Sequence, residues 1–222
     1  MPGEVFGLPW VEGTFWRGAF EHQRQMLEFH TTLAGDHPYE SPPWSWIALK
    51  RPVAYYFSVE GGSYREILAL GNPLAWWPAA AALVALAVRW VRTGAMLSRA
   101  EPVIVAGAFA TYAPWLILSG TRSQVFLWYL LPTVPFLCLA LGAVAAWFWT
   151  ARIGQGVVAA FALVALASFA FYLPVLTALP LSPAEWQARI LFRDCSRTDG
   201  PPLTLPDDEI NKGLPPSGWC WV

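Results

Sequence analysis

Charged side chains are scarce in the middle of this sequence. Only 13% of the 222 residues are Asp, Glu, Lys or Arg, about half the usual share of a soluble domain. Residues 1–66 hold 13 of these charges and residues 185–222 hold 10, which leaves six in the 118 residues from 67 to 184. Water cannot easily solvate so long a surface with so few charges, whereas a surface that faces lipid needs none.

Histidine and cysteine are also rare, with three residues of each. His22, His30 and His37 all precede the uncharged region, which argues against a haem or metal site inside a helix bundle. No Cys or carboxylate cluster accompanies them, so no metal ligand is predicted. The sequence shows no Gly-rich phosphate loop, nucleophile elbow or Cys-x-x-Cys pair. A net charge of −1 provides no basic surface for nucleic acid.

The uncharged intervals are each long enough to cross a bilayer as a helix, which takes roughly 20 residues. Helices are favoured there because lipid cannot satisfy backbone hydrogen bonds. The predicted fold class is therefore an all-α integral membrane protein with about four transmembrane helices. These helices are predicted at about 73–91, 102–120, 124–149 and 155–178.

The regions on either side of the spans differ from them in composition. Residues 1–72 are predicted to form an extracytoplasmic loop, residues 73–184 the four-helix transmembrane region, and residues 185–222 a mostly irregular tail. Within the loop, charged residues recur at helical spacing over about 14–34, as in Arg24 and Glu28. This amphipathic helix fits the membrane interface, and it fits packing against the spans nearly as well.

Loop charges predict the orientation. The first connection carries Arg89, Arg92 and Arg99, and loops rich in Lys and Arg stay in the cytoplasm. The protein is therefore predicted to be a multi-pass protein of the cell (plasma) membrane. Because successive connections alternate between the two sides, loop 1–72 and the C-terminal tail are predicted to be extracytoplasmic. The first residues include no signal peptide, so the chain is expected to be the end of a longer membrane protein, with a reverse signal-anchor at the first span as the alternative.

The three cysteines lie in different surroundings. Cys138 lies in an apolar run and is expected to be buried in packing. Cys195 and Cys220 lie in the polar tail, where they can form a disulfide if the tail faces an oxidising compartment.

Two outer stretches contain candidate binding residues. The first, from His37 to Tyr56, is dense in Trp, Tyr and Pro, and indole faces stack on sugar rings or anchor a loop in the lipid headgroup zone. The second contains Arg122, at the predicted outer end of two spans. Its guanidinium can grip a lipid-linked phosphate with two parallel hydrogen bonds or reach lipid headgroups.

These stretches resemble the bacterial protein O-mannosyltransferases, and the order and spacing agree from about residue 9 to 178. The matching positions are Met26-x-x-Phe29-His30-x-x-Leu33, His37-Pro38-Tyr39-x-Ser41-x-Pro43-Trp44-x-Trp46, Arg51-Pro52-Val53-x-Tyr55-Tyr56 and Arg122-x-x-x-Phe126-x-x-Tyr129-x-x-Pro132-x-x-Pro135-Phe136. They correspond to the last large outer loop and the final four spans of that family, which has a many-span glycosyltransferase fold of the C type.

The resemblance implies transfer of mannose from polyprenyl-phosphate-mannose to Ser or Thr hydroxyls of exported proteins, with inversion at the sugar carbon. Arg122 is the expected ligand of the carrier phosphate. The catalytic carboxylate of the family lies in its first outer loop, which is upstream of this chain, so the N-terminal half of the enzyme is an expected partner. No cofactor beyond the lipid-linked donor is expected. The residues expected to shape the sugar or acceptor end of the cleft are His37, Tyr39, Ser41, Trp44 and Trp46.

Two other classes of protein fit parts of the sequence. One is a non-catalytic four-helix membrane scaffold or partner subunit, because no catalytic carboxylate can be assigned in this chain. The other is a transporter subunit, which the lack of charged groups inside the spans disfavours.

Overall fold

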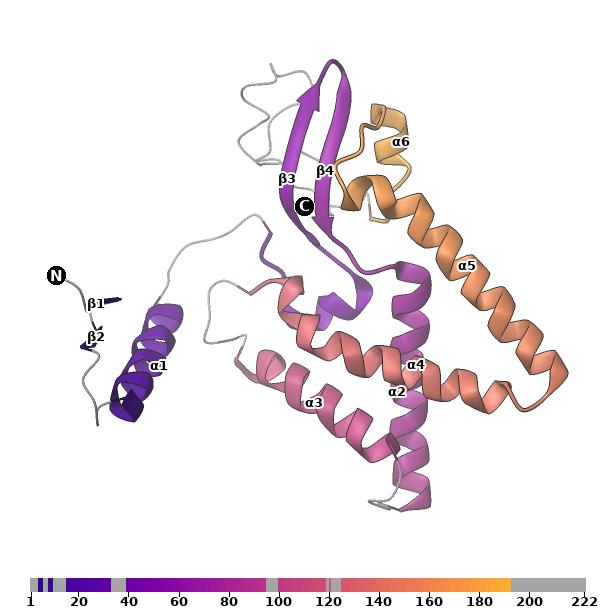
Figure 1. The fold of residues 1–222 in the computed structure, drawn as a ribbon, viewed down its shortest axis with the longest axis horizontal. Helices are drawn as coiled ribbons and strands as arrows, with labels where there is room; N and C mark the ends of the chain where they lie inside the picture. Colours follow the sequence, from indigo (N-terminus) through magenta and orange to yellow (C-terminus); the bar gives the residue numbers. More distant parts are fainter. Residues whose placement is uncertain are drawn as a thin grey trace.

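The computed structural model describes residues 4–5, 8–9, 15–32, 39–94, 100–118, 120 and 125–192. Four long helices form the body, and a β-hairpin stands at one end of them (Figure 1). The elements in chain order are β1 (Glu4–Val5), β2 (Leu8–Pro9), α1 (Phe15–Thr32), the 3₁₀ helix η1 (Pro43–Ala48), β3 (Val53–Glu60), β4 (Ser63–Ala69), α2 (Pro73–Thr93), α3 (Ala100–Leu118), the 3₁₀ helix η2 (Leu127–Thr133), α4 (Val134–Phe148), α5 (Arg152–Leu176) and α6 (Pro183–Gln187).

The predicted fold class was an all-α membrane protein with about four transmembrane helices, and the structure confirms a mostly helical protein with four candidate spans. Four helical segments are long and apolar enough to cross a membrane, and they are α2, α3, α5 and the continuous pair η2–α4. The third span begins at Leu127 as a 3₁₀ helix, whereas an α-helix was predicted from residue 124. Pro132 and Pro135 explain the tighter start, because neither residue can donate the backbone hydrogen bond that an α-helix needs.

Few residues of the spans are buried inside the protein. In α5 the buried positions are Gly154, Ser168, Tyr172 and Val175, near the two ends of the helix. Apolar residues such as Leu163 are exposed in between, as expected for a surface that faces lipid. α2 packs mainly on α4 and α3, while α5 diverges from them and returns to the hairpin (Figure 1).

The close packing of α2, α3 and α4 depends on small residues. Ala82, Ala108 and Ala140 are buried in the three helices, and small side chains let helix backbones approach closely in lipid. At the end away from the hairpin, the Arg89 guanidinium lies 3.4 Å from a Glu101 carboxylate oxygen and 4.7 Å from the ring centroid of Trp147. One arginine therefore joins all three helices.

The hairpin was not predicted. β3 pairs antiparallel with β4, and Glu60 faces Ser63 across a two-residue turn. Gly61 and Gly62 form the turn with φ angles of 56° and 79°, and a turn of this kind needs positive φ at both positions, which glycine adopts without strain. The glycine pair between two strand-like runs was the signal in the sequence.

α1 occupies Phe15–Thr32, within the helix predicted over 14–34. Its charged face carries two ion pairs, from Arg24 to Glu21 at 2.6 Å and to Glu28 at 3.5 Å. Phe20 and Leu27 are exposed on the helix. Placement of this helix in the membrane interface stays a prediction.

The segment that follows α5 holds the hairpin in place. Tyr64 and Leu181 exchange two backbone hydrogen bonds of 2.8 and 2.9 Å, and Ala178 N–H donates to the Glu66 carbonyl at 2.9 Å. Trp186 of α6 is fully buried against Phe57 and Tyr64, with ring centroids 5.3 and 4.9 Å away. The hairpin and the end of α5 therefore share one aromatic core.

A carboxyl group lies inside this core. Glu66 is 1% exposed, and its Oε2 accepts a 2.6 Å hydrogen bond from the indole nitrogen of Trp186. Among the residues that the structure describes, none bonds its Oε1. Burial raises the pKa of Glu66 from 4.5 to about 7, and the hydrogen bond from Trp186 opposes that rise only in part. The folded protein therefore holds this proton more tightly than the unfolded chain does.

We expect a pH dependence of stability from Glu66. The protonated carboxyl contributes fully to the free energy of unfolding below about pH 4.5. This contribution is lost as the pH rises to about 7, which lowers the free energy of unfolding by an amount on the order of 3 kcal/mol. In Glu66→Gln the amide oxygen still accepts from Trp186 but cannot ionise. Melting temperatures in detergent between pH 5 and pH 8 should fall for the wild type and stay flatter for Glu66→Gln. The exposed Glu60→Gln should behave like the wild type; an unchanged slope in Glu66→Gln would contradict the assignment.

A second expectation concerns the turn between α4 and α5. A Cβ at Gly154 would overlap the backbone carbonyl oxygen of Phe148, whereas nothing lies within 4 Å of a Cβ at Gly156. Gly154→Ala should destabilise the protein by about 1–3 kcal/mol, while Gly156→Ala should be neutral or gain up to about 1 kcal/mol from helix propensity. Equal melting temperatures for the two variants would refute the close approach.

Candidate functional site: an aromatic junction beside the hairpin

A segment that carries predicted site residues meets, at one end of the helices, the segment that follows Arg122 in the sequence. We call residues 39–51 the first segment and residues 125–133 the second segment. The backbone N–H of Ser41 donates to the carbonyl of Val125 at 2.9 Å, so the segments are joined directly. Four predicted residues lie outside the described part of the chain, namely His37, Arg122, Cys195 and Cys220.

Aromatic rings fill the space between the two segments and α3. Trp46 is fully buried, and its ring centroid lies 6.4 Å from those of Tyr112, Trp115 and Tyr129. Trp115 and Tyr129 stack at 4.5 Å with an interplanar angle of 13°. We call these four residues the aromatic junction. It joins the first segment, the end of α3 and η2 in one packed unit.

Hydrogen bonds fix the first segment within the junction. The indole nitrogen of Trp46 donates to the carbonyl and the hydroxyl oxygen of Ser41, at 3.0 and 2.9 Å. The Tyr112 hydroxyl donates to the carbonyl of Pro43 at 2.7 Å. Such bonds are directional as well as stabilising, so they determine the path of the chain from Ser41 to Trp46.

The second segment has its own bond to α3. The hydroxyls of Thr111 and Thr133 lie 2.9 Å apart, and Thr133 is buried. Thr111 directly precedes Tyr112, so one turn of α3 bonds both segments. Neither threonine was predicted to lie in the site. The signal in the sequence was the adjacent pair Thr111 and Tyr112, two hydroxyl side chains in an otherwise apolar span. Polar groups in such a span usually bind another helix or loop.

Burial separates the predicted residues of the first segment into two kinds. Tyr39, Ser41 and Trp46 are 5%, 3% and 0% exposed, whereas Trp44 is 70% exposed. In the described part of the chain, Trp44 is thus the predicted cleft residue whose ring is open to a ligand. The other three hold the backbone that presents it.

The end of the first segment is bent back on its start. Leu49 and Arg51 have positive φ angles of 58° and 52°, which are uncommon for residues with a side chain. The guanidinium of Arg51 donates to the carbonyl of Glu40 at 3.1 Å. This bond closes the loop around η1 and keeps the Glu40 backbone beside the junction.

An apolar cavity borders the second segment. It has a volume of about 430 Å³ between α2, η2, α4 and the end of β4, and its lining includes Trp76, Trp128 and Cys138. Cys138 is exposed there instead of buried, contrary to the expectation from its apolar surroundings, because in this span apolar surroundings include the lipid face. A cavity of this character suits a hydrocarbon chain.

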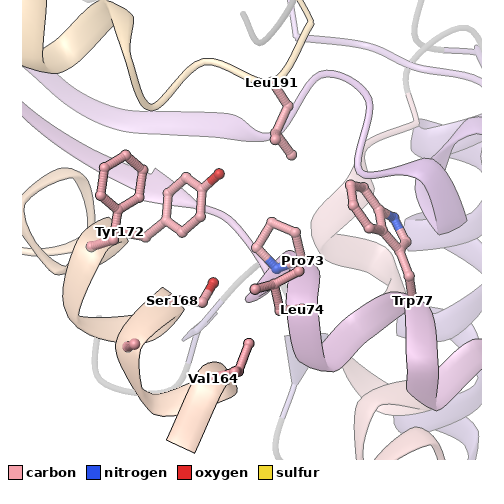
Figure 2. A pocket seen from close by; sticks show the side chains of 9 residues that line it. Pro73, Leu74, Trp77, Val164, Ser168, Tyr172 and Leu191 are labelled. Atoms are coloured by element: carbon pink, nitrogen blue, oxygen red, sulfur yellow. The ribbon is translucent and has the colours of Figure 1, made fainter. Parts of the chain in front are cut away.

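A second cavity lies between α2 and α5, with a volume of about 400 Å³. At its base the Ser168 hydroxyl donates to the side-chain oxygen of Asn72 at 2.8 Å, which ties the two helices together. Figure 2 shows Ser168 and Tyr172 of α5 on one side of the cavity and Pro73, Leu74 and Trp77 of α2 on the other. It is also mostly apolar and opens between two lipid-facing helices.

The described residues contain no group of three or more His, Cys, Asp or Glu side chains that could hold a metal ion. The candidate site combines the exposed indole of Trp44, on a backbone held by the junction, with apolar cavities between the helices. That combination suits an amphiphile with a sugar or polar head at the helix ends and a hydrocarbon chain along the spans.

Comparisons with known proteins agree with this chemistry. The family model described as the C-terminal four TMM region of protein-O-mannosyltransferase matches residues 15–195. The polyprenol-phosphate-mannose–protein mannosyltransferase of Corynebacterium glutamicum is 30% identical over 144 residues, which are 60% of this chain and 26% of the relative. The protein of the same name from Mycobacterium tuberculosis is 27% identical over 194 residues, 78% of this chain and 36% of the relative.

A solved structure shares the fold. It is that of the Saccharomyces cerevisiae protein O-mannosyltransferase Pmt1–Pmt2 complex bound to the sugar donor, with a TM-score of 0.64 and 21% identity. The match covers 86% of this chain and 28% of that one. The chain thus spans about a third or less of the length of these relatives.

We expect the two tryptophans of η1 to differ sharply in their effect on stability. Trp46→Phe removes two buried hydrogen bonds and part of the junction, which should cost about 2–4 kcal/mol. Trp44→Phe changes an exposed ring and should leave stability within about 0.5 kcal/mol. Melting temperatures in detergent compare the two, and a Trp44→Phe loss as large as that of Trp46→Phe would contradict the burial pattern.

Proposed function

Because the chain belongs to the protein O-mannosyltransferase family, as its C-terminal four-helix membrane region, we propose that it forms the C-terminal part of an enzyme that moves mannose from polyprenyl-phosphate-mannose to Ser or Thr hydroxyls of exported proteins. The observation that supports this most directly is the bond between Ser41 and Val125. It joins the segment with the exposed Trp44 to the segment that follows Arg122, so one site can hold both a sugar and a phosphate.

The site lies on the extracytoplasmic side of the plasma membrane in this proposal. The three arginines Arg89, Arg92 and Arg99 favour a cytoplasmic first connection, and the junction is at the opposite end of α2 and α3. Exported proteins then reach Trp44 from outside, and the lipid-linked donor enters sideways from the membrane. The apolar cavities beside η2 and between α2 and α5 provide room for its hydrocarbon chain.

The proposed reaction is a displacement at the sugar carbon. The acceptor hydroxyl oxygen attacks C1 of mannose while a carboxylate removes the hydroxyl proton. The bond between C1 and the phosphate oxygen breaks, and its electron pair leaves with polyprenyl phosphate. Arg122 stabilises the negative charge that develops there. The carboxylate comes from the N-terminal part of the enzyme in this proposal, and His37, Tyr39, Ser41, Trp44 and Trp46 shape or support the sugar and acceptor end.

The test uses an assembled enzyme, in which this chain replaces the corresponding C-terminal region of the Corynebacterium glutamicum relative. It is produced in a strain without its own mannosyltransferase. Membranes are supplied with labelled polyprenyl-phosphate-mannose and a Ser/Thr-rich acceptor peptide. We expect mannosylated peptide; a folded, correctly inserted enzyme without any transfer would refute the proposed function and favour the membrane scaffold.

Within that assay, Arg122→Ala should raise the KM for the donor by about tenfold or more, because a charge-assisted bidentate contact to phosphate is lost. Arg122→Lys keeps the positive charge but cannot form two parallel hydrogen bonds, so its donor KM should lie between those of the wild type and Arg122→Ala. Arg152→Ala is the control, since that exposed arginine begins α5 at the other end of the helices. A donor KM unchanged in Arg122→Ala would exclude the phosphate role.

A further inference from the structure

The hydroxyl of Tyr112 bonds α3 to the first segment. It donates to the carbonyl of Pro43 at 2.7 Å, and Pro43 begins η1 and directly precedes the exposed Trp44. The Tyr112 ring also contacts Trp46, at 6.4 Å between centroids. Tyr112 of α3 therefore contacts the first segment both before Trp44, at Pro43, and after it, at Trp46.

The neighbouring residue provides a frame for this contact. Thr111 bonds Thr133 at the end of η2, so the turn of α3 that contains Thr111 and Tyr112 contacts both halves of the candidate site. A regular helix holds consecutive side chains in a fixed relation. The distance between the first and second segments is thus set by α3 as well as by the hydrogen bond between Ser41 and Val125.

We propose that Tyr112 is a positioning residue for mannosyl transfer, whose hydroxyl holds the Trp44-bearing segment in register with the second segment. This inference rests on the proposed function. Tyr112 acts through the Pro43 carbonyl and the Trp46 ring, and it does not touch the reacting atoms. Its effect should therefore appear in turnover, where alignment of acceptor and donor matters, more than in donor binding.

The removal of one hydroxyl tests the proposal. In the assembled enzyme, Tyr112→Phe keeps the ring contact with Trp46 but loses the bond to Pro43. We expect kcat to fall about three- to tenfold, the range that corresponds to one intramolecular hydrogen bond, with the donor KM within about twofold of the wild type. Arg122→Ala should instead raise the donor KM, so the donor KM separates loss of alignment from loss of donor binding.

The loss of a hydroxyl far from the junction is the control. The Thr93 hydroxyl donates to the carbonyl of Arg89 at 2.9 Å, at the end of α2 that lies away from the junction. Thr93→Val should leave kcat at the wild-type value. If Tyr112→Phe has the same kcat as Thr93→Val, the positioning role is refuted.

A readout without catalysis keeps this test separate from that of the proposed function. Hydrogen–deuterium exchange of the chain in detergent should become faster in residues 39–50 of Tyr112→Phe, while the hairpin residues 53–69 keep the wild-type rate. Unchanged exchange in residues 39–50 overturns the inference even if the wild type transfers no mannose. Faster exchange throughout the helices, with a lower melting temperature, overturns it as well, because Tyr112 would then stabilise the whole bundle.

Discussion

Hydrocarbon offers no hydrogen bonds to a polypeptide, and this constraint governs the division of the chain into two kinds of structure. The four spans satisfy their own backbones as helices and bury few of their side chains inside the protein. Polar contacts between segments can then form where the helices end. At one end, Arg89 of α2 contacts Glu101 of α3 and Trp147 of α4. At the other end the hairpin, η1 and η2 make a larger set of contacts.

That larger set determines what the molecule can bind. Ser41, Thr111 and Tyr112 bond segments that are far apart in the sequence, and the buried ring of Trp46 fills the space between them. The backbone around Trp44 is consequently rigid while its ring is exposed. A rigid aromatic side chain loses little conformational entropy when it stacks on a sugar. The adjacent apolar cavities suit the lipid part of the same substrate.

The helices and the two outer segments could be predicted from the sequence because their signals are local. Runs without charge identify the spans, and the dense Trp, Tyr and Pro residues identify the first segment. The β3–β4 hairpin was missed although Gly61 and Gly62 were visible, because its strands are stabilised by Trp186 and Leu181, more than 110 residues away. The burial of Tyr39, Ser41 and Trp46, in contrast to Trp44, could not be predicted either. Trp46 packs against Tyr112 and Val125, and Ser41 bonds Val125. Tyr39 packs in the core of the hairpin with Phe57 and Trp186. No local pattern in the sequence connects these residues.

The most direct test of this account is the labelling of single cysteines in intact cells, with the three native cysteines replaced by alanine. Trp44→Cys reports on the first segment, and Gly120→Cys reports on the connection that precedes the second. Thr150→Cys lies between α4 and α5, at the other end of the helices. The account predicts that a membrane-impermeant maleimide reaches Trp44→Cys and Gly120→Cys from outside but not Thr150→Cys. Labelling of Trp44→Cys and Gly120→Cys from opposite sides of the membrane would contradict it.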